Sequence, residues 1–141
     1  MQQVTHAVET LADLIIRPQR ADYRTDELVG GSTGKFAVRG GKRCVRLDFS
    51  LPNARGHTLE ASLFAPDVGE GGLAGMPCIV YGHGNCGCRL DAGDVVRLML
   101  PHDVCVACLD FAGSGLSGGD FITLGALEPQ DLKVIITFLR W

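Results

Sequence analysis

Two glycine-rich segments of this 141-residue chain carry the residue types that could do chemistry. The first, residues 82–87, reads Gly-His-Gly-Asn-Cys-Gly, and the second, residues 110–117, reads Asp-Phe-Ala-Gly-Ser-Gly-Leu-Ser. Each follows a short apolar run that is typical of a buried strand. Turns that follow adjacent parallel strands meet at the carboxyl edge of a sheet, where α/β proteins bind and transform their ligands. We therefore expect both segments to build one site.

The elements around these segments predict an α/β domain. Residues 44–51 and 59–64 alternate apolar and polar side chains on either side of a Pro-Asn-Ala-Arg-Gly turn, which predicts a β-hairpin with one buried face. The apolar runs at residues 77–81 and 104–109 show no alternation, so we expect parallel strands that are covered on both faces. Helical periodicity over residues 90–100 joins them in a strand–helix–strand crossover.

Two further helices are predicted near the ends of the chain. Residues 3–17 place apolar side chains at helical spacing, and Pro18 is expected to end that helix. We expect its apolar side to pack against the domain or against a missing part of it, because its polar side lacks the basic residues of a membrane-surface helix. Residues 22–41 are polar and glycine-rich, which indicates an irregular connector. A last helix is predicted from residue 127 onward.

The composition is that of an ordinary soluble protein. The chain has 46% hydrophobic and 21% charged residues, a formal net charge of −3 and no cluster of Lys or Arg, which argues against nucleic acid as a partner. No segment has the length of a membrane span or the pattern of a secretory signal, so we expect a cytoplasmic protein. We divide the chain into an N-terminal helix and connector, residues 1–41, and an α/β domain, residues 42–141.

One interpretation of the first segment is a dinucleotide-binding fingerprint. Gly82, Gly84 and Gly87 match GxGxxG after a strand, and the glycines would let a pyrophosphate approach a helix N-terminus. Asp110 ends the next strand, where it could hold a ribose hydroxyl. Against this interpretation, the fingerprint usually opens its domain, whereas here a hairpin and a long N-terminal segment come first. Residues 85–90 also delay the start of the helix.

A zinc site is a second interpretation. Cys86-x-Cys88 and Cys105-x-x-Cys108 resemble paired zinc ligands. Successive side chains of a strand point to opposite faces, so Cys105 and Cys108 cannot converge on one ion. We therefore expect no metal and no other cofactor, and a reducing compartment for the six cysteines. Cys86 and Cys88 lie in a turn and are candidates for reactive thiols.

A serine-nucleophile pattern is also present, since residues 115–119 match GxSxG with Ser117 at its centre. A nucleophile elbow is a strained turn whose serine directly follows a strand and directly precedes a helix. Ser117 lies well beyond the strand that ends at Leu109, and Gly-Gly-Asp-Phe follows it. The elbow geometry therefore fails, and we reject Ser117 as the nucleophile.

Taken together, the two segments resemble the α/β-hydrolase superfamily. Residues 80–85, Val-Tyr-Gly-His-Gly-Asn, are similar to the HGN turn after strand three of serine hydrolases. Residues 110–117 are similar to the DxxGxGxS loop after strand four of the same proteins. Residues 53–59 and 16–23 resemble the sequences of members of the serine aminopeptidase (S33-like) branch from plants and protists. The resemblance covers nearly the whole chain.

This resemblance implies an α/β fold and a site. We expect the N-terminal part of an α/β-hydrolase fold, in which an antiparallel hairpin joins parallel strands with flanking helices in an incomplete sheet. The backbone N–H of Asn85 would form half of an oxyanion hole. His83 and Gly84 would support the turn that carries it, and Asp110 would tie the second loop together.

The catalytic serine, acid and histidine of such relatives come further along the chain. We therefore expect the N-terminal half of a serine hydrolase, truncated before the nucleophile elbow and inactive alone. The full-length enzyme would act on a small-molecule ester or a peptide, and strand 77–81 would have an open apolar edge. A Rossmann-like nucleotide-binding domain and a non-catalytic remnant that acts as an interaction module stay open as alternatives. The sequence does not decide the oligomeric state.

Overall fold

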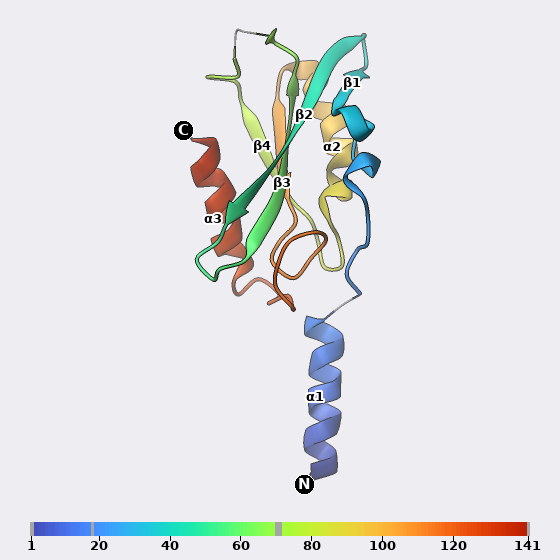
Figure 1. Ribbon diagram of the computed structural model, residues 1–141, viewed down its shortest axis with the longest axis vertical. Coiled ribbons are helices and arrows are strands. Elements are labelled where there is room, and N and C mark those ends of the chain that lie inside the picture. Colours follow the sequence, from blue (N-terminus) through green and yellow to red (C-terminus); the bar gives the residue numbers. More distant parts are fainter. Residues whose placement is uncertain (1, 18, 70–71, 141) are drawn as a thin grey trace.

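A mixed five-stranded sheet forms the centre of the computed structural model, which describes residues 2–17, 19–69 and 72–140 (Figure 1). Its order is β1-β2-β3-β5-β4. The strands are β1 Lys35–Val38, β2 Lys42–Pro52, β3 Thr58–Pro66, β4 Cys78–Gly82 and β5 Cys105–Leu109. Neighbouring strands are antiparallel except β4 and β5, which are parallel. The predicted α/β fold, with an antiparallel hairpin joined to parallel strands, is confirmed.

Helices cover both faces of this sheet (Figure 1). α2, Gly93–Met99, lies on one face and α3, Glu128–Leu139, lies on the other. The cluster under α2 includes Phe64, Val96 and Val106, and the cluster under α3 includes Leu59, Leu109 and Ile135. The predicted crossover and final helix are therefore confirmed. Short 3₁₀ turns, Arg89–Ala92 and Leu100–His102, extend α2 at its two ends.

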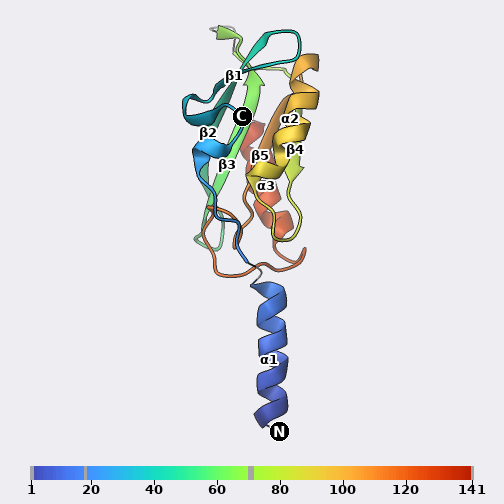
Figure 2. The ribbon, with the colours of Figure 1, turned by 90° about the vertical axis from the view of Figure 1, so that its right-hand side faces the viewer.

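The predicted N-terminal helix is also present, as α1, Gln2–Ile16. It extends away from the sheet (Figures 1 and 2), and the apolar side chains that should pack are each more than half exposed. They are Val4, Val8, Leu11, Leu14 and Ile15. Packing of this side against the described domain was therefore a wrong expectation. Pro18, expected to end the helix, lies outside the described residues.

Among the described residues, none of the helices combines the length and the apolarity that a bilayer crossing requires.

The expectation of an irregular connector is wrong for Lys35–Val38, which form β1. Four residues are too few for alternation to indicate a strand, and their strand conformation depends on pairing with β2, where Phe36 lies opposite Cys44. The ring of Phe36 also packs edge-on against that of Phe64, with centroids 6.2 Å apart. Tertiary contacts therefore decide the structure of this segment.

β2 and β3 confirm the hairpin, but its buried faces differ from the prediction. Leu47, on the face expected to be buried, is 50% exposed. Cys44 and Arg46, on the face expected to be wet, are 1% and 8% exposed. The Arg46 guanidinium donates to three carbonyls of residues 28–31, so the N-terminal loop covers that face. A single wet face was therefore a wrong prediction.

β4 is an edge of the described sheet. Tyr81 packs against the cluster under α2 and Val80 against the cluster under α3, so the expectation that β4 is covered on both faces is confirmed only in part. β5 pairs with it on one side, and no described strand lies on the other. Cys78 is exposed and Ile79 is 38% exposed, whereas every residue of β5 is buried. The open apolar edge expected for this strand is present.

Candidate active site

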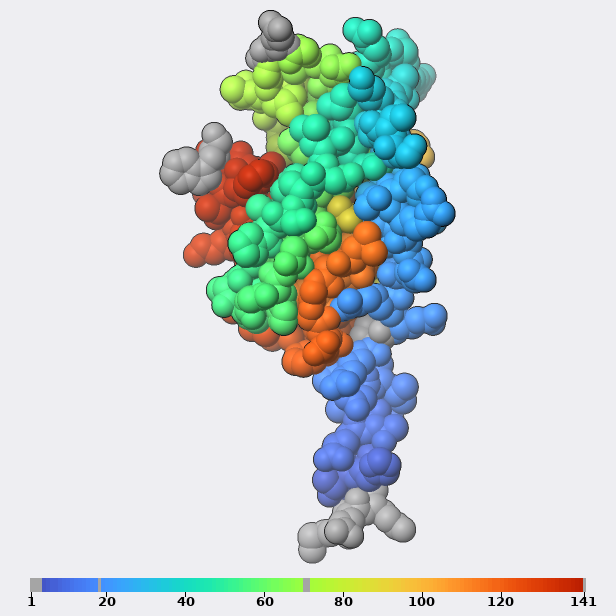
Figure 3. All heavy atoms as spheres, viewed as in Figure 1, coloured from blue at the N-terminus to red at the C-terminus, as the bar shows by residue number. Residues whose placement is uncertain are grey.

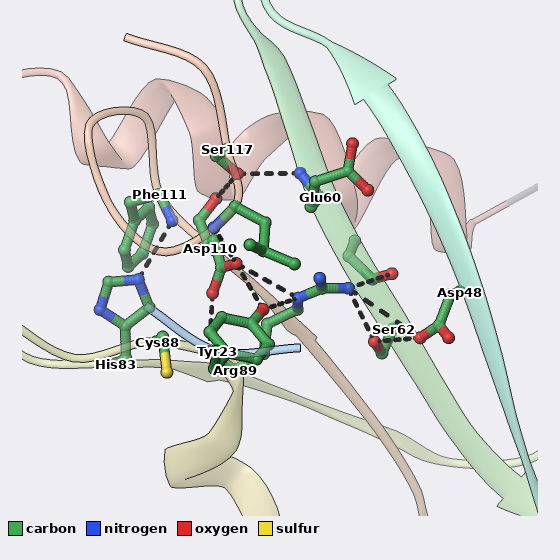
Figure 4. Close-up of polar contacts among 12 residues, drawn as sticks. Tyr23, Asp48, Glu60, Ser62, His83, Cys88, Arg89, Asp110, Phe111 and Ser117 are labelled. Carbon is green, nitrogen blue, oxygen red and sulfur yellow. Dashed lines mark hydrogen bonds and ion pairs between the residues drawn. The ribbon is translucent and has the colours of Figure 1, made fainter. Parts of the chain in front are cut away.

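Two loops meet beyond the carboxyl ends of β4 and β5: the first loop, residues 83–88, follows β4, and the second loop, residues 110–127, follows β5. The side chain of His83 joins them (Figure 4). Its Nε2 accepts a hydrogen bond from the backbone N–H of Phe111 at 3.1 Å. Because an N–H can only donate, the proton of the ring lies on Nδ1, which donates to the carbonyl of Gly84 at 2.8 Å. Both ring nitrogens are therefore used within the protein, and His83 fastens the first loop to the second.

Asn85 lies at the exposed tip of the first loop, and its N–H bonds to no acceptor within the described part of the chain. The left-handed residue of this loop is Cys86, with a φ of 61°. Gly84 has no such φ, and a Cβ there would meet nothing within 4 Å, so glycine leaves open space beside Asn85 rather than permitting a bend. Packing requires glycine at Gly87, where a Cβ would overlap the Asp91 carboxylate.

A pocket of about 360 Å³ opens beside Asn85, within the size range of small-molecule sites. Both loops and the first turn of α3 line it, with apolar and polar side chains. Its lining residues are His83, Gly84, Asn85, Phe111, Ser114, Ile122, Leu124, Gly125 and Glu128.

Asp110 is completely buried at the end of β5, and its carboxylate binds three separate segments (Figure 4). Oδ1 accepts from the N–H of Arg89 at 2.7 Å, and Oδ2 accepts from the N–H of Leu116 at 2.9 Å and the hydroxyl of Tyr23 at 2.6 Å. Gly115, with a φ of 46°, brings the loop so close that a Cβ would overlap this carboxylate. Asp110 is thus enclosed and does not reach a ribose, which argues against the dinucleotide interpretation.

Ser117 is 1% exposed, and its hydroxyl already makes two hydrogen bonds. Oγ donates to the carbonyl of Asp110 at 2.6 Å and accepts from the N–H of Glu60 at 2.8 Å. In the described ranges, neither a histidine nor another base bonds to it. The hydroxyl therefore fastens the second loop to β3 and has no access to a substrate.

Sequence reasoning missed two buried partners of Asp110. Arg89 is 1% exposed and donates to the Tyr23 hydroxyl, the Ala61 carbonyl and the Ser62 hydroxyl, while its Nε lies 3.4 Å from Asp110 Oδ2. Tyr23 is 4% exposed, and burial and then its bond to Asp110 raise the pKa of its phenol. A lone arginine and a lone tyrosine in polar segments carry no local signal of burial, so only the fold identifies them.

A second buried carboxylate, Asp131 on α3, was also missed. It accepts from the side-chain amide of Asn53 at 2.9 Å, the guanidinium of Arg55 at 2.8 Å and the N–H of Ala112 at 3.2 Å. It therefore ties the hairpin turn to the start of the second loop. An acid in the first turn of a helix is ordinarily a surface residue, and its burial could not be inferred.

Glu128, the first residue of α3, fixes the wall of the pocket. Oε1 accepts from the N–H of Thr123 at 2.7 Å, and Oε2 accepts from the Thr123 hydroxyl at 2.7 Å and the N–H of Gly125 at 2.8 Å. Partial burial raises the pKa of this carboxyl, but the hydrogen bonds outweigh burial and hold the pKa at about 2. The charged form thus organises the end of the second loop.

The six cysteines are free thiols, four of them buried. Cys105 and Cys108 are buried in β5, and burial raises the pKa of Cys108 to about 12. Cys88 is 3% exposed, and burial raises the pKa of its thiol, which argues against the suggested reactivity, whereas Cys86 is exposed and stays a candidate. Across the residues that the structure describes, no group of three or more His, Cys, Asp or Glu could hold a metal ion.

Solved structures with a similar fold include esterases. An esterase of Pyrococcus furiosus, Pf2001, matches with a TM-score of 0.55 and 21% identity over 67% of this chain and 35% of its own. A hypothetical protein of Pseudomonas aeruginosa, PA2218, matches with a TM-score of 0.58 and 20% identity over 68% of this chain and 30% of its own. This chain therefore spans about a third of the length of these structures. No family model and no curated protein matches the sequence.

These similarities define the class of fold. The sheet and its flanking helices form an α/β fold like that of esterase-like α/β hydrolases, over part of the chain. The identities are too low to show more than the fold.

The variant Ser117→Ala tests the structural use of this hydroxyl. We expect it to lower the free energy of unfolding by about 1–3 kcal/mol, because the Asp110 carbonyl and the Glu60 N–H each lose a buried partner. Urea unfolding followed by circular dichroism measures this, with the exposed Ser32→Ala as control. We also expect a fluorophosphonate probe to leave Ser117 unmodified, as read by mass spectrometry of its peptide. A labelled Ser117 would show that the hydroxyl reaches substrates after all.

The variant Glu128→Gln tests the hydrogen-bonded carboxylate of the pocket wall through pH. The pKa of about 2 lies below the ordinary value of 4.5, so the charged form stabilises the fold above about pH 4.5. That contribution is lost as the pH falls towards about 2. We therefore expect Glu128→Gln to be less stable than the parent at neutral pH and the difference to shrink below about pH 4.5, in urea titrations at several pH values. The exposed Glu9→Gln is the control, and a difference that is constant with pH contradicts the prediction.

Proposed function

We propose that this chain is the N-terminal part of a serine hydrolase of the S33-like branch and supplies one side of its active site. The reaction is acyl transfer from an ester, amide or peptide bond to water. The supporting observation is the N–H of Asn85, which has no acceptor among the described residues and which the His83–Phe111 hydrogen bond holds beside a pocket. A fixed backbone donor in a pocket stabilises the negative oxygen of a tetrahedral intermediate, and its effect is strongest where water is excluded.

The pocket favours a small apolar group next to this donor. Phe111, Ile122 and Leu124 form its apolar wall, and a volume of about 360 Å³ accommodates a short acyl chain or a single side chain. The substrate that we propose is therefore a small-molecule ester or a short peptide.

The nucleophile of the proposed enzyme lies in a segment beyond the described residues. Ser117 is enclosed, so the serine has to reach Asn85 from another direction. A further parallel strand on the free side of β4 would end beside the first loop, as the strand before a nucleophile elbow does in the α/β-hydrolase fold. We propose that this strand, the histidine and the acid complete the enzyme, and that the 141 residues alone are inactive.

Hydrolysis of p-nitrophenyl esters tests this proposal. The assay compares the 141-residue chain with the polypeptide that the whole reading frame encodes. We expect the reading frame to continue into a strand followed by GxSxG, and the longer polypeptide alone to hydrolyse the ester and to react with a fluorophosphonate at the new serine. A stop codon directly after residue 141, or a longer polypeptide without hydrolysis, would overturn the proposal.

The variant Asn85→Pro in that longer polypeptide tests the donor itself. Proline has no N–H, so we expect kcat to fall by about 10²–10³ while KM changes little. Asn85→Ala is the matched control, because it removes the side chain and keeps the N–H, and its kcat should stay near that of the parent. Equal losses in the two variants would assign the effect to the side chain or the turn instead of the backbone donor.

A further inference from the structure

Tyr23 comes from a segment that precedes the whole sheet, yet its ring lies in the interior against Leu28 and Cys88. The segment around it is bonded to the second loop at two other places. The carbonyl of Ile16 accepts from the N–H of Ile122 at 2.8 Å, and the Arg20 guanidinium donates to carbonyls of that loop. In Figure 3 the second loop, in orange, lies directly against this N-terminal segment, in blue.

The hydroxyl of Tyr23 lies between the two buried charges of the site (Figure 4). It donates to Asp110 Oδ2 at 2.6 Å and accepts from Arg89 Nε at 2.7 Å. Arg89 and Asp110 are 1% and 0% exposed, and Nη2 of Arg89 has no partner within the described part of the chain. Buried charges destabilise a fold when their hydrogen bonds are not made, so the loss of this hydroxyl affects both charged groups.

Asp110 and the residue that follows it hold both ends of the loop that carries Asn85. Its far end is fixed where the N–H of Arg89 donates to Asp110 Oδ1 at 2.7 Å. Its near end is fixed where His83 accepts from the N–H of Phe111, the residue that follows Asp110, at 3.1 Å. A shift of Asp110 therefore moves both anchors of the loop together, and a shift of Arg89 moves the far one.

Removing the Tyr23 hydroxyl would disturb both buried charges. Arg89 Nε would lose its acceptor, and Asp110 Oδ2 lies 3.4 Å from it. Either the guanidinium moves towards the carboxylate, which displaces the backbone of Arg89, or a buried N–H stays unpaired.

We propose that Tyr23 is a positioning residue for the oxyanion turn: through Asp110 and Arg89, its hydroxyl sets where Asn85 lies relative to the second loop. The meaning of this position for catalysis rests on the proposed function. Tyr23 itself contacts no substrate, and the N-terminal segment becomes part of the framework of the active site.

Amide NMR of the 141-residue chain tests this directly, with Tyr23→Phe against Tyr81→Phe, the chain's other tyrosine. Tyr23→Phe keeps the buried ring and removes only the hydroxyl. We expect hydrogen exchange of the Arg89 and Phe111 amides to become about 10-fold faster and the Asn85 amide resonance to shift, while β2–β3 amides do not change. Tyr81→Phe should leave all of these unchanged.

Three results would overturn the proposal. They are unchanged amides in Tyr23→Phe, changes that stop at Arg89 and do not reach Phe111 and Asn85, and a uniform acceleration over the whole chain. If Tyr23→Phe does not fold, 3-fluorotyrosine in the parent chain replaces it, because fluorine makes the hydroxyl a stronger donor without removing it. The Phe111 and Asn85 resonances must then move, and unmoved resonances reject the proposal.

The NMR readout needs no hydrolysis, so it separates this inference from the proposed function. In the longer polypeptide we further expect Tyr23→Phe to lower kcat about 10-fold with KM unchanged. Changed amides without any hydrolysis in the parent would reject the proposed function and keep the role of Tyr23 in placing the turn. Hydrolysis with an unchanged kcat in Tyr23→Phe would reject the role of Tyr23 and keep the proposed function.

Discussion

The buried carboxylate of Asp110 is the interaction on which the arrangement of the site depends. A charge without solvent contact destabilises a fold unless several donors surround it, and here three donors from three segments do so. The position of the carboxylate explains other features of the sequence. Gly115 is required because a Cβ would overlap it, and Tyr23 is buried because its hydroxyl completes it. The N-terminal segment and the loop after β5 are thus joined through one carboxylate at the end of a fully buried strand.

Carboxylates add to backbone hydrogen bonding along the rest of the second loop. Residues 110–127 have almost no regular structure, so their N–H groups need acceptors other than a strand or a helix. Asp110, Asp131 and Glu128 accept from four of them, those of Ala112, Leu116, Thr123 and Gly125. These hydrogen bonds hold the pocket-lining residues of the loop in place, although the loop is neither helix nor strand. The low pKa of Glu128 follows from the same bonding, because its carboxylate accepts from the loop that it orders.

Local sequence patterns predicted those parts of the structure that local physics decides. Apolar runs and helical periodicity gave β4, α2 and β5 in order, and the glycine-rich turns marked where a site lies. Contacts between distant residues decide the rest. β1 exists because β2 pairs with it, and the partners Tyr23 and Asp110 are 87 positions apart. For α1, the sequence pattern predicted packing against the domain, but the apolar side of the helix is exposed. An apolar stripe indicates that a helix needs a partner but not where that partner lies.

The direction in which the chain winds explains why a site lies at the end of an edge strand. β4, α2 and β5 form a crossover that runs from the edge inward, with α2 on one face. α3 lies on the other face. Because crossovers are right-handed in nearly all proteins, a connection across that face would run the opposite way along the sheet, and under the proposed function it would bring a parallel strand to the free side of β4.

With such a strand in place, the strand order would reverse at β4. Crevices at such reversals, outside the carboxyl ends of the strands, are where open α/β sheets bind ligands. The loop with the unpaired Asn85 N–H lies at this point, and so does the pocket. Under the proposed function, the open edge of β4 and the free Asn85 N–H of the described chain have one explanation. Both face the strand that would complete the hydrolase sheet and bring the serine to the oxyanion turn.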